Sequence, residues 1–244
     1  RRSGDGEGRA DRFAAGHRVL GAGHQPAVVY VARRLARQLQ GVEQGHVGVQ
    51  QHAQEARDAV LHASASAEVL IVADFGHGMI SGCVVDALVA TPAFLVVNTQ
   101  ANAGNRGFNT ISKYPRADYV CLASHEAQLE ARASNATWRE LAVMLAARVR
   151  SPKFTITRGR TGTAHYTVPD QFYEAPSLAT QVTDRVGAGD AVLALTGPLV
   201  AVDAPWDIVA LLGNLAGAQM VADLGNRTTL NRVGLVKAVQ ALLK

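Results

Sequence analysis

From residue 68 to residue 244, short apolar runs alternate with stretches suited to helices, and this rhythm restricts the chain to few architectures. A run such as VLIVADF (69–75) is closed by Gly76 and Gly78, which is typical of a buried strand. Strands that alternate with helices favour a mostly parallel sheet that helices cover on both faces. The sequence therefore predicts an α/β domain with three layers.

The individual elements can be placed along the chain from the same pattern. The predicted strands cover 69–75, 93–99, 118–123, 153–159 and 163–169, and the last two form a hairpin-like pair. The predicted helices cover 84–90, 126–133, 137–149, 188–201, 206–222 and 232–243. The stretch 137–149 is the clearest amphipathic helix among them.

The beginning of the chain has a different composition. Residues 1–62 contain nine arginines, six acidic residues, seven glutamines, five of the eight histidines and no lysine. Residues 28–37 and 53–61 each predict no more than a helical turn or two. We therefore expect 1–67 to be an atypical, weakly ordered head, and 68–244 to be the folded core. A solvated regulatory extension and a non-native sequence would both explain this head.

Charge and cysteine content exclude several classes of protein. The net charge is +4, but residues 63–244 carry fifteen basic and fourteen acidic residues, so no nucleic-acid surface is expected. Cys83 and Cys121 are too few for a disulfide framework or a CxxC metal site. No apolar stretch approaches 18 residues, and 1–12 lack the apolar centre of a signal peptide. A cytoplasmic protein without a membrane partner is expected.

The segment 183–200 (TDRVGAGDAVLALTGPLV) carries the strongest chemical signal. Gly187 and Gly189 precede an apolar helix, and backbone N–H groups at such a helix start can bind phosphate oxygens. Asp190 would stand beside that anion and could accept a hydroxyl proton. The alternative is a helix-capping aspartate after a glycine turn. No GxGxxG follows a strand and no GxxxxGK[ST] occurs, which argues against Rossmann and P-loop sites.

Residues 184–190 (DRVGAGD) resemble DTxGAGD, the C-terminal signature of the ribokinase-like (PfkB) carbohydrate kinases. The resemblance implies that Gly187, Ala188 and Gly189 form an anion hole and that Asp190 is the catalytic base. It also places Asp184 and Arg185 at the nucleotide. Arg185 departs from the family pattern, which has threonine at this position.

Other segments resemble the same family in the same order. Thr157, Gly159 and Gly162 fit the TxGxxG element that borders ATP, although a glycine hairpin alone would have this form. Asn214 lies in GNLAGA (213–218), which is similar to the helix that flanks adenine. Asn98 ends a strand that would face the nucleotide. The resemblance therefore adds these five residues to the expected nucleotide site.

The expected magnesium site rests on Glu126 in LASHEAQL (122–129), which resembles the NxxE element that organises Mg²⁺ through water. Ala123 replaces the asparagine of that element, and an ordinary first-turn helix glutamate is the alternative. His77 stands where the family usually has lysine. The amide-rich stretch 98–121 most resembles the heptose-phosphate kinase subgroup, which is often fused to a nucleotidyltransferase; its Asn102 and Asn105 could instead stabilise a long loop.

Together these features predict a ribokinase-like three-layer α/β/α fold, with 68–244 as the nucleotide-binding half. The sugar-binding Gly-Gly motif and the lid of the family are not recognisable in 1–67, so the N-terminal part is expected to be incomplete. The expected function is transfer of the ATP γ-phosphoryl group, with Mg²⁺, to a hydroxyl of a small sugar or sugar phosphate. The alternative is a nucleotide-binding remnant or scaffold. A homodimer and a linked nucleotidyltransferase domain are left open.

Overall fold

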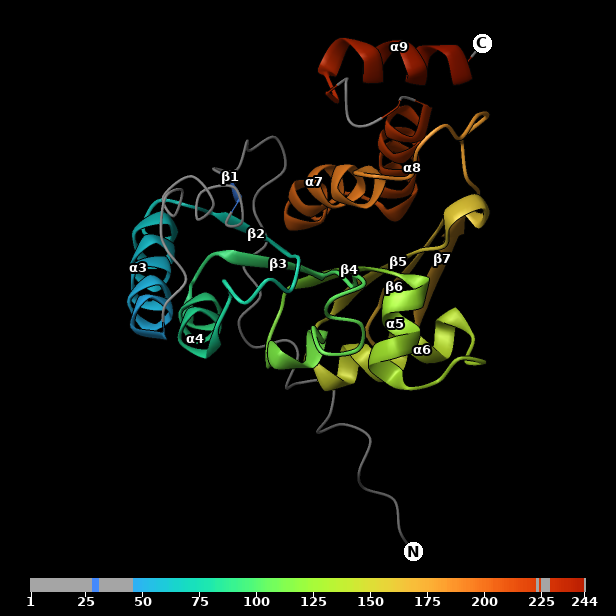
Figure 1. Ribbon diagram of the computed structural model, residues 1–244. Helices are drawn as coiled ribbons and strands as arrows, with labels where there is room; N and C mark the ends of the chain where they lie inside the picture. Colours follow the sequence, from blue (N-terminus) through green and yellow to red (C-terminus); the bar gives the residue numbers. More distant parts are fainter. Residues whose placement is uncertain (1–27, 31–45, 223, 225–228, 244) are drawn as a thin grey trace, which may run out of the picture.

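The computed structural model describes residues 28–30, 46–222, 224 and 229–243. Within these residues one sheet of seven strands runs in chain order from β1 to β7 (Figure 1). Strands β1 to β5 are parallel, whereas β6 and β7 are antiparallel to their neighbours. The strands are β1 (Val28–Tyr30), β2 (Val69–Asp74), β3 (Phe94–Thr99), β4 (Tyr119–Ala123), β5 (Lys153–Thr157), β6 (Thr163–Thr167) and β7 (Gln171–Ala175).

Helices cover both faces of this sheet, which confirms the predicted three-layer α/β fold. They are α3 (His46–Ser64), α4 (Gly82–Ala90), α5 (Ser124–Ala131), α6 (Trp138–Arg148), α7 (Ala188–Ala201), α8 (Trp206–Ala222) and α9 (Arg232–Leu242). Short 3-10 turns lie at Ile111–Lys113 and Gly159–Thr161. Helices α4 to α9 begin and end within two residues of their predicted positions.

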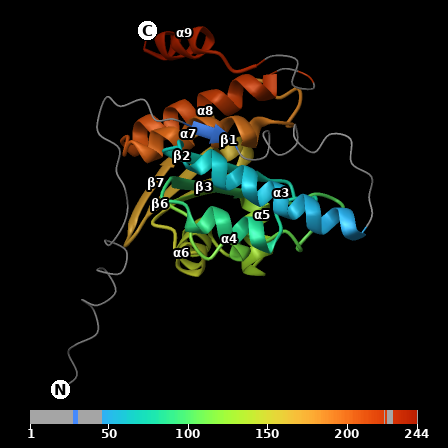
Figure 2. The ribbon, with the colours of Figure 1, turned by 90° about the vertical axis from the view of Figure 1, so that its left-hand side faces the viewer.

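The alternation of side chains along each strand divides the core into two clusters. On β3, Leu95 and Val97 pack into the cluster that includes residues of α3 to α6, while Phe94 and Val96 pack into the cluster with α7. Figure 2 shows α7 and α8 on one side of the sheet and α4 and α6 on the other. One face is thus covered by helices from the first part of the chain and the other by helices from its last part.

Helix α3 corrects the predicted boundary at residue 67. Ala56, Val60 and Ala63 on this helix are at most 2% exposed and belong to the buried core. Strand β1 pairs in parallel with β2. For 28–30 and 46–67, the prediction of a weakly ordered head separate from the core is therefore wrong. The rest of that prediction, at 1–27 and 31–45, lies outside the described residues.

Among the described residues, no helix combines the length and the apolar character that crossing a membrane requires.

Candidate active site

Helix α7 packs closely on the sheet at Gly197, and its first turn lies at the carboxyl end of β3, where Asp190 contacts Gln100. A Cβ at Gly197 would lie 3.2 Å from Ile71 Cδ1 and 3.3 Å from Val96 Cγ1, so a larger residue would push the helix outward. At the helix start, Gly187 has a φ of 80°, in the left-handed region that favours glycine. A Cβ at Gly189 would meet nothing within 4 Å. The first turn of α7 therefore borders open space, as an anion site requires.

Asp190 lies in this first turn and is half-buried. Gln100, which directly follows β3, donates from Nε2 to Asp190 Oδ1 at 2.6 Å. Burial raises the pKa of Asp190, and the hydrogen bond from Gln100 opposes this shift. A carboxylate with a raised pKa is a better proton acceptor at neutral pH than an exposed aspartate. The geometry and the pKa direction both suit a general base.

Glu126 lies in the first turn of α5, near the same space. Its Oε1 accepts from the backbone N–H of Ala101 at 3.2 Å and its Oε2 from that of Ala123 at 2.8 Å. Burial raises the pKa of Glu126, the two backbone hydrogen bonds and the charge of His125 lower it, and the carboxylate of Asp190 raises it. The two carboxylates therefore repel one another across the site.

A hard cation near these two carboxylates would offset their repulsion, and oxygen ligands suit Mg²⁺. Among the described residues, however, no group of three His, Cys, Asp or Glu side chains is arranged to hold a metal. Both oxygens of Glu126 already accept backbone hydrogen bonds. The donor set thus fits an ion held through water and not a closed cage of side chains.

Asn98, the last residue but one of β3, carries a buried polar atom without a partner among the described residues. Its side chain is 9% exposed, and Nδ2 donates to the carbonyl of Cys121 at 2.8 Å. Among the described residues, Asn98 Oδ1 has no hydrogen-bond partner. A buried acceptor without a partner is costly, so a ligand donor at this position would stabilise the site. Contact with a nucleotide remains a prediction.

The residues of the predicted TxGxxG element form the turn between β5 and β6. Thr157 ends β5, and Gly159 and Gly162 have φ values of 57° and 97°. A Cβ at Gly162 would lie 2.1 Å from the carbonyl oxygen of Ala175, so this glycine is required by the close approach of β7. These contacts explain the shape of the turn, and its contact with ATP remains a prediction.

Asn214, on α8, points toward the sheet. It is 8% exposed, and its Nδ2 donates to Thr163 Oγ1 at 2.9 Å and to the carbonyl of Ala210 at 2.9 Å. Thr163 Oγ1 is 2.9 Å from His165 Nε2, and His165 Nδ1 is 2.8 Å from Thr155 Oγ1. Burial, with the charge of Arg158, lowers the pKa of His165 to about 3, so this histidine is neutral. Asn214 thus anchors α8 to the sheet, and its contact with adenine remains a prediction.

Asp184 and Arg185 precede the glycine turn. Asp184 Oδ1 accepts from the backbone N–H of Val186 at 3.0 Å, which closes a tight turn before Gly187. The side chain of Arg185 is exposed. The glycine turn, Asp190 and Glu126 therefore come together at one edge of the sheet, while the nucleotide roles of Asp184 and Arg185 stay predictions.

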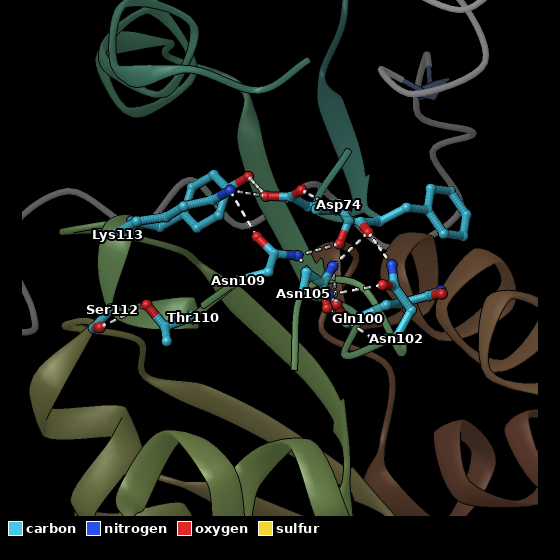
Figure 3. A network of polar contacts seen from close by, with 11 residues as sticks. Asp74, Gln100, Asn102, Asn105, Asn109, Thr110, Ser112 and Lys113 are labelled. Carbon is cyan, nitrogen blue, oxygen red and sulfur yellow. Dashed lines mark hydrogen bonds and ion pairs between the residues drawn. The ribbon is translucent and has the colours of Figure 1, made fainter. Parts of the chain in front are cut away.

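A polar network around Asp74 was not predicted as part of the site (Figure 3). Asp74 is 3% exposed; its carboxylate forms an ion pair with Lys113 and accepts from Tyr114 Oη at 2.7 Å. Asn109 Nδ2 donates to the carbonyl of Asp74 at 2.8 Å, and Asn105 Nδ2 to that of Phe75 at 2.8 Å. The amide-rich stretch therefore closes the ends of β2 and β3, as the loop-stabilising alternative for Asn105 anticipated.

The fold and the helix-start site define a ribokinase-like α/β protein. Residues 94–232 match the model of the pfkB family carbohydrate kinases, and the chain belongs to this family. It is 26% identical over 192 residues to the bifunctional protein HldE of Shewanella piezotolerans and 26% identical over 167 residues to that of Desulfatibacillum aliphaticivorans. The first match covers 75% of this chain and 37% of the relative, and the second 66% and 33%. The chain thus spans about a third of these relatives' length.

Solved structures support the same fold. A ribokinase from Arabidopsis thaliana, complexed with ribose and ATP, has a TM-score of 0.61 at 15% identity, over 75% of this chain and 59% of its own. Phosphofructokinase-2 from Escherichia coli, in complex with potassium, has a TM-score of 0.65 at 14% identity, over 79% and 62%. At these identities the likeness concerns the fold.

Proposed function

We propose that this chain is an ATP-dependent carbohydrate kinase that transfers the γ-phosphoryl group of ATP to a hydroxyl of a sugar or sugar phosphate. One observation carries the proposal. An open glycine turn and a half-buried carboxylate, Asp190, stand together at the start of α7. Phosphoryl transfer needs little else from a protein than positioning and charge stabilisation.

The chemistry follows from the two parts of this turn. The backbone N–H groups of Gly187, Ala188 and Gly189 hold the oxygens of the transferred phosphoryl group, where negative charge is spread during the reaction. Asp190 Oδ1 accepts the N–H of Gln100, so Oδ2 receives the proton of the attacking hydroxyl. The products are ADP and the phosphorylated sugar.

We assign the nucleotide contacts to the residues that the family resemblance indicates, namely Asn98, Thr157, Gly159, Gly162, Asp184, Arg185 and Asn214. The unpartnered Oδ1 of Asn98 supports this assignment, because it needs a donor. Mg²⁺, when bound, would offset the negative charge of the phosphates. Glu126, fixed by the backbone of Ala101 and Ala123, would orient its waters.

For the acceptor we propose a heptose phosphate, and for the whole protein a link to a nucleotidyltransferase domain. The support is the resemblance of 98–121 to that kinase subgroup and the similarity to the bifunctional protein HldE.

The second candidate is a nucleotide-binding remnant without turnover. Arg185, Ala123 and His77 favour it, since each replaces a residue usual at a phosphate- or metal-facing position of the family.

A two-stage experiment tests the proposal and separates the two candidates. The first stage measures the thermal shift of the chain with ATP, with and without Mg²⁺. The second measures ADP release with pentoses, hexoses, heptoses and their monophosphates. ADP release that occurs with one acceptor and is lost in Asp190→Asn supports the kinase. ATP binding without release for any acceptor supports the remnant, and absence of ATP binding refutes both.

A further inference from the structure

We propose that Gln100 is a positioning residue for the base Asp190, and that the amide-rich segment 100–109 serves to hold Gln100 in place. The inference rests on the proposed kinase function and deepens it. Gln100 lies outside the glycine turn, 90 positions before Asp190 in the chain, and none of the motifs described above assigns it a role.

The first support is the contact itself. Gln100 Nε2 lies 2.6 Å from Asp190 Oδ1, a short hydrogen bond from a neutral donor to a carboxylate. With Oδ1 fixed in this way, the carboxylate cannot rotate freely, and Oδ2 stays in one orientation. A base that is held in one orientation raises the rate of the reaction because the reacting atoms are already aligned.

The second support is that the backbone of Gln100 is held on both sides. Its N–H donates to the carbonyl of Asp74 at 2.8 Å, which extends the pairing of β2 and β3 by one residue. Its carbonyl accepts from Asn109 Nδ2 at 3.2 Å and from Asn105 Nδ2 at 3.3 Å. A loop residue with this many backbone partners does not move independently of the sheet (Figure 3).

The third support is a glycine that makes room for this arrangement. A Cβ at Gly76 would lie 2.0 Å from Asn105 Nδ2 and 2.8 Å from Asn109 Cβ. Gly76 also has a φ of 71°, which favours glycine. The turn after β2 is thus shaped so that both asparagines reach the carbonyl of Gln100.

The choice of an amide also fits the task. The charge of Asp190 raises the pKa of two described groups, Glu126 on α5 and the buried thiol of Cys121 on β4, while His125 acts on Glu126 in the opposite direction. A cationic neighbour would hold the proton acceptor more firmly ionised and weaken it as a base. A neutral amide orients the carboxylate with a smaller loss of basicity.

The test compares Gln100→Met with Gln100→Lys in the full chain. Methionine keeps the length of the side chain and removes the donor, whereas lysine keeps a donor and adds charge. With Mg²⁺, ATP and the best acceptor of the panel, we expect Gln100→Met to lower kcat about 10- to 100-fold, with the KM for ATP within about twofold. The acid limb of the kcat profile should move to higher pH in Gln100→Met and to lower pH in Gln100→Lys.

Gln54→Met is the matched control, because Gln54 Nε2 also donates to a carboxylate, Asp58 Oδ1, but on α3 and in an exposed position. Its kcat should equal that of the wild type. A merely structural role of Gln100 would not shift the acid limb of the kcat–pH profile in opposite directions in the two Gln100 variants. An unchanged kcat in Gln100→Met, or a shift of the acid limb in the same direction in both variants, would overturn the inference.

A readout without turnover separates this inference from the proposed function. The titration of the Asp190 carboxyl group can be followed by carbon NMR, with Asp190→Asn to assign the signal. If the wild type transfers no phosphate but this titration moves up in Gln100→Met and down in Gln100→Lys, the kinase proposal fails and the contact stands. If the titration does not move in either variant, Gln100 does not hold Asp190, whatever the activity.

Discussion

Replacing Gly189 by alanine should separate the stability of the α7 start from its binding of phosphate. The added Cβ would meet nothing within 4 Å, so the folded chain can accept it without strain. Alanine in a helix is worth about 0.5–1 kcal/mol over glycine. For a chain of this length, such a gain raises Tm by about 1–4 °C.

The same methyl group would occupy the open space in which we place phosphate oxygens. We therefore expect Gly189→Ala to bind ATP at least about tenfold more weakly, which corresponds to about 1.4 kcal/mol. Gly187→Ala is the matched comparison. Its φ of 80° should make alanine cost about 1–2 kcal/mol of folding free energy. Neighbouring glycines should thus change stability in opposite directions.

Urea unfolding gives the free energies of unfolding, and isothermal titration calorimetry with ATP and Mg²⁺ gives the affinities. A Gly189→Ala chain that is more stable and binds ATP as well as the wild type would remove this turn from the phosphate site. A Gly189→Ala chain that is less stable would show that the space beside the first turn is not open.

Three further predictions follow from single side chains. Asp190→Asn should lower phosphoryl transfer by about 10²–10⁴ and keep ATP binding. Since burial raises the pKa of Asp190, ionisation of this group costs the wild type stability as pH rises from about 3.9. Urea unfolding should therefore find the variant more stable than the wild type at pH 7 but not at pH 3. Arg185→Thr should leave Tm unchanged, because the side chain of Arg185 is exposed. In calorimetry, the variant should bind ATP more weakly and with a smaller salt dependence than the wild type. The same salt dependence in both chains would mean that Arg185 points away from the phosphates. Because the pKa of His165 falls to about 3, protonation favours the unfolded chain, and the contribution of His165 to the free energy of unfolding should fall by about 1.4 kcal/mol for each pH unit between 6.5 and about 3. His165→Gln should flatten that slope in urea unfolding, and an equal slope in both chains would contradict the neutral histidine.

The sequence predicts the central strands well because they are buried on both faces. Every residue of β3 is buried and its first four residues are apolar, and its predicted and observed bounds differ by one residue. Strand β7 was missed because it lies at the edge of the sheet and its residues are mostly exposed. Its sequence, QFYEA, offers neither an apolar run nor a turn signal.

Helix α3 was underestimated for a related reason. Its described buried residues are mostly alanines, which give a weak periodic signal between glutamine, arginine and histidine. The unusual composition of 1–62 led to the prediction of a weakly ordered segment that includes this helix, whereas the buried face of α3 belongs to the core.

The site residues that could be predicted are those whose pattern lies within one short segment of the sequence. The GAGD turn is a local pattern, so its place at the start of α7 could be predicted from the residues themselves. Gln100 could not, since its partner lies 90 positions away. One signal was available: Asn98 and Gln100 are two residues apart where β3 ends, so they share the face toward α7. The two-residue period could have extended the Asn98 prediction to Gln100.

The division of the core between early and late helices has a consequence for synthesis in the cell. Strands β2 to β4 can pair as they leave the ribosome, because their order in the sheet is their order in the chain. Yet Ile71, Val96 and Tyr119 pack in a cluster whose described helical residues come from α7 and α8, and α7 begins only at residue 188. At about 5–20 residues per second, the ribosome needs roughly 4–16 s to travel from Tyr119 to the end of α7. During that interval an apolar half of the sheet faces water, and a chaperone that binds nascent chains would find its target there.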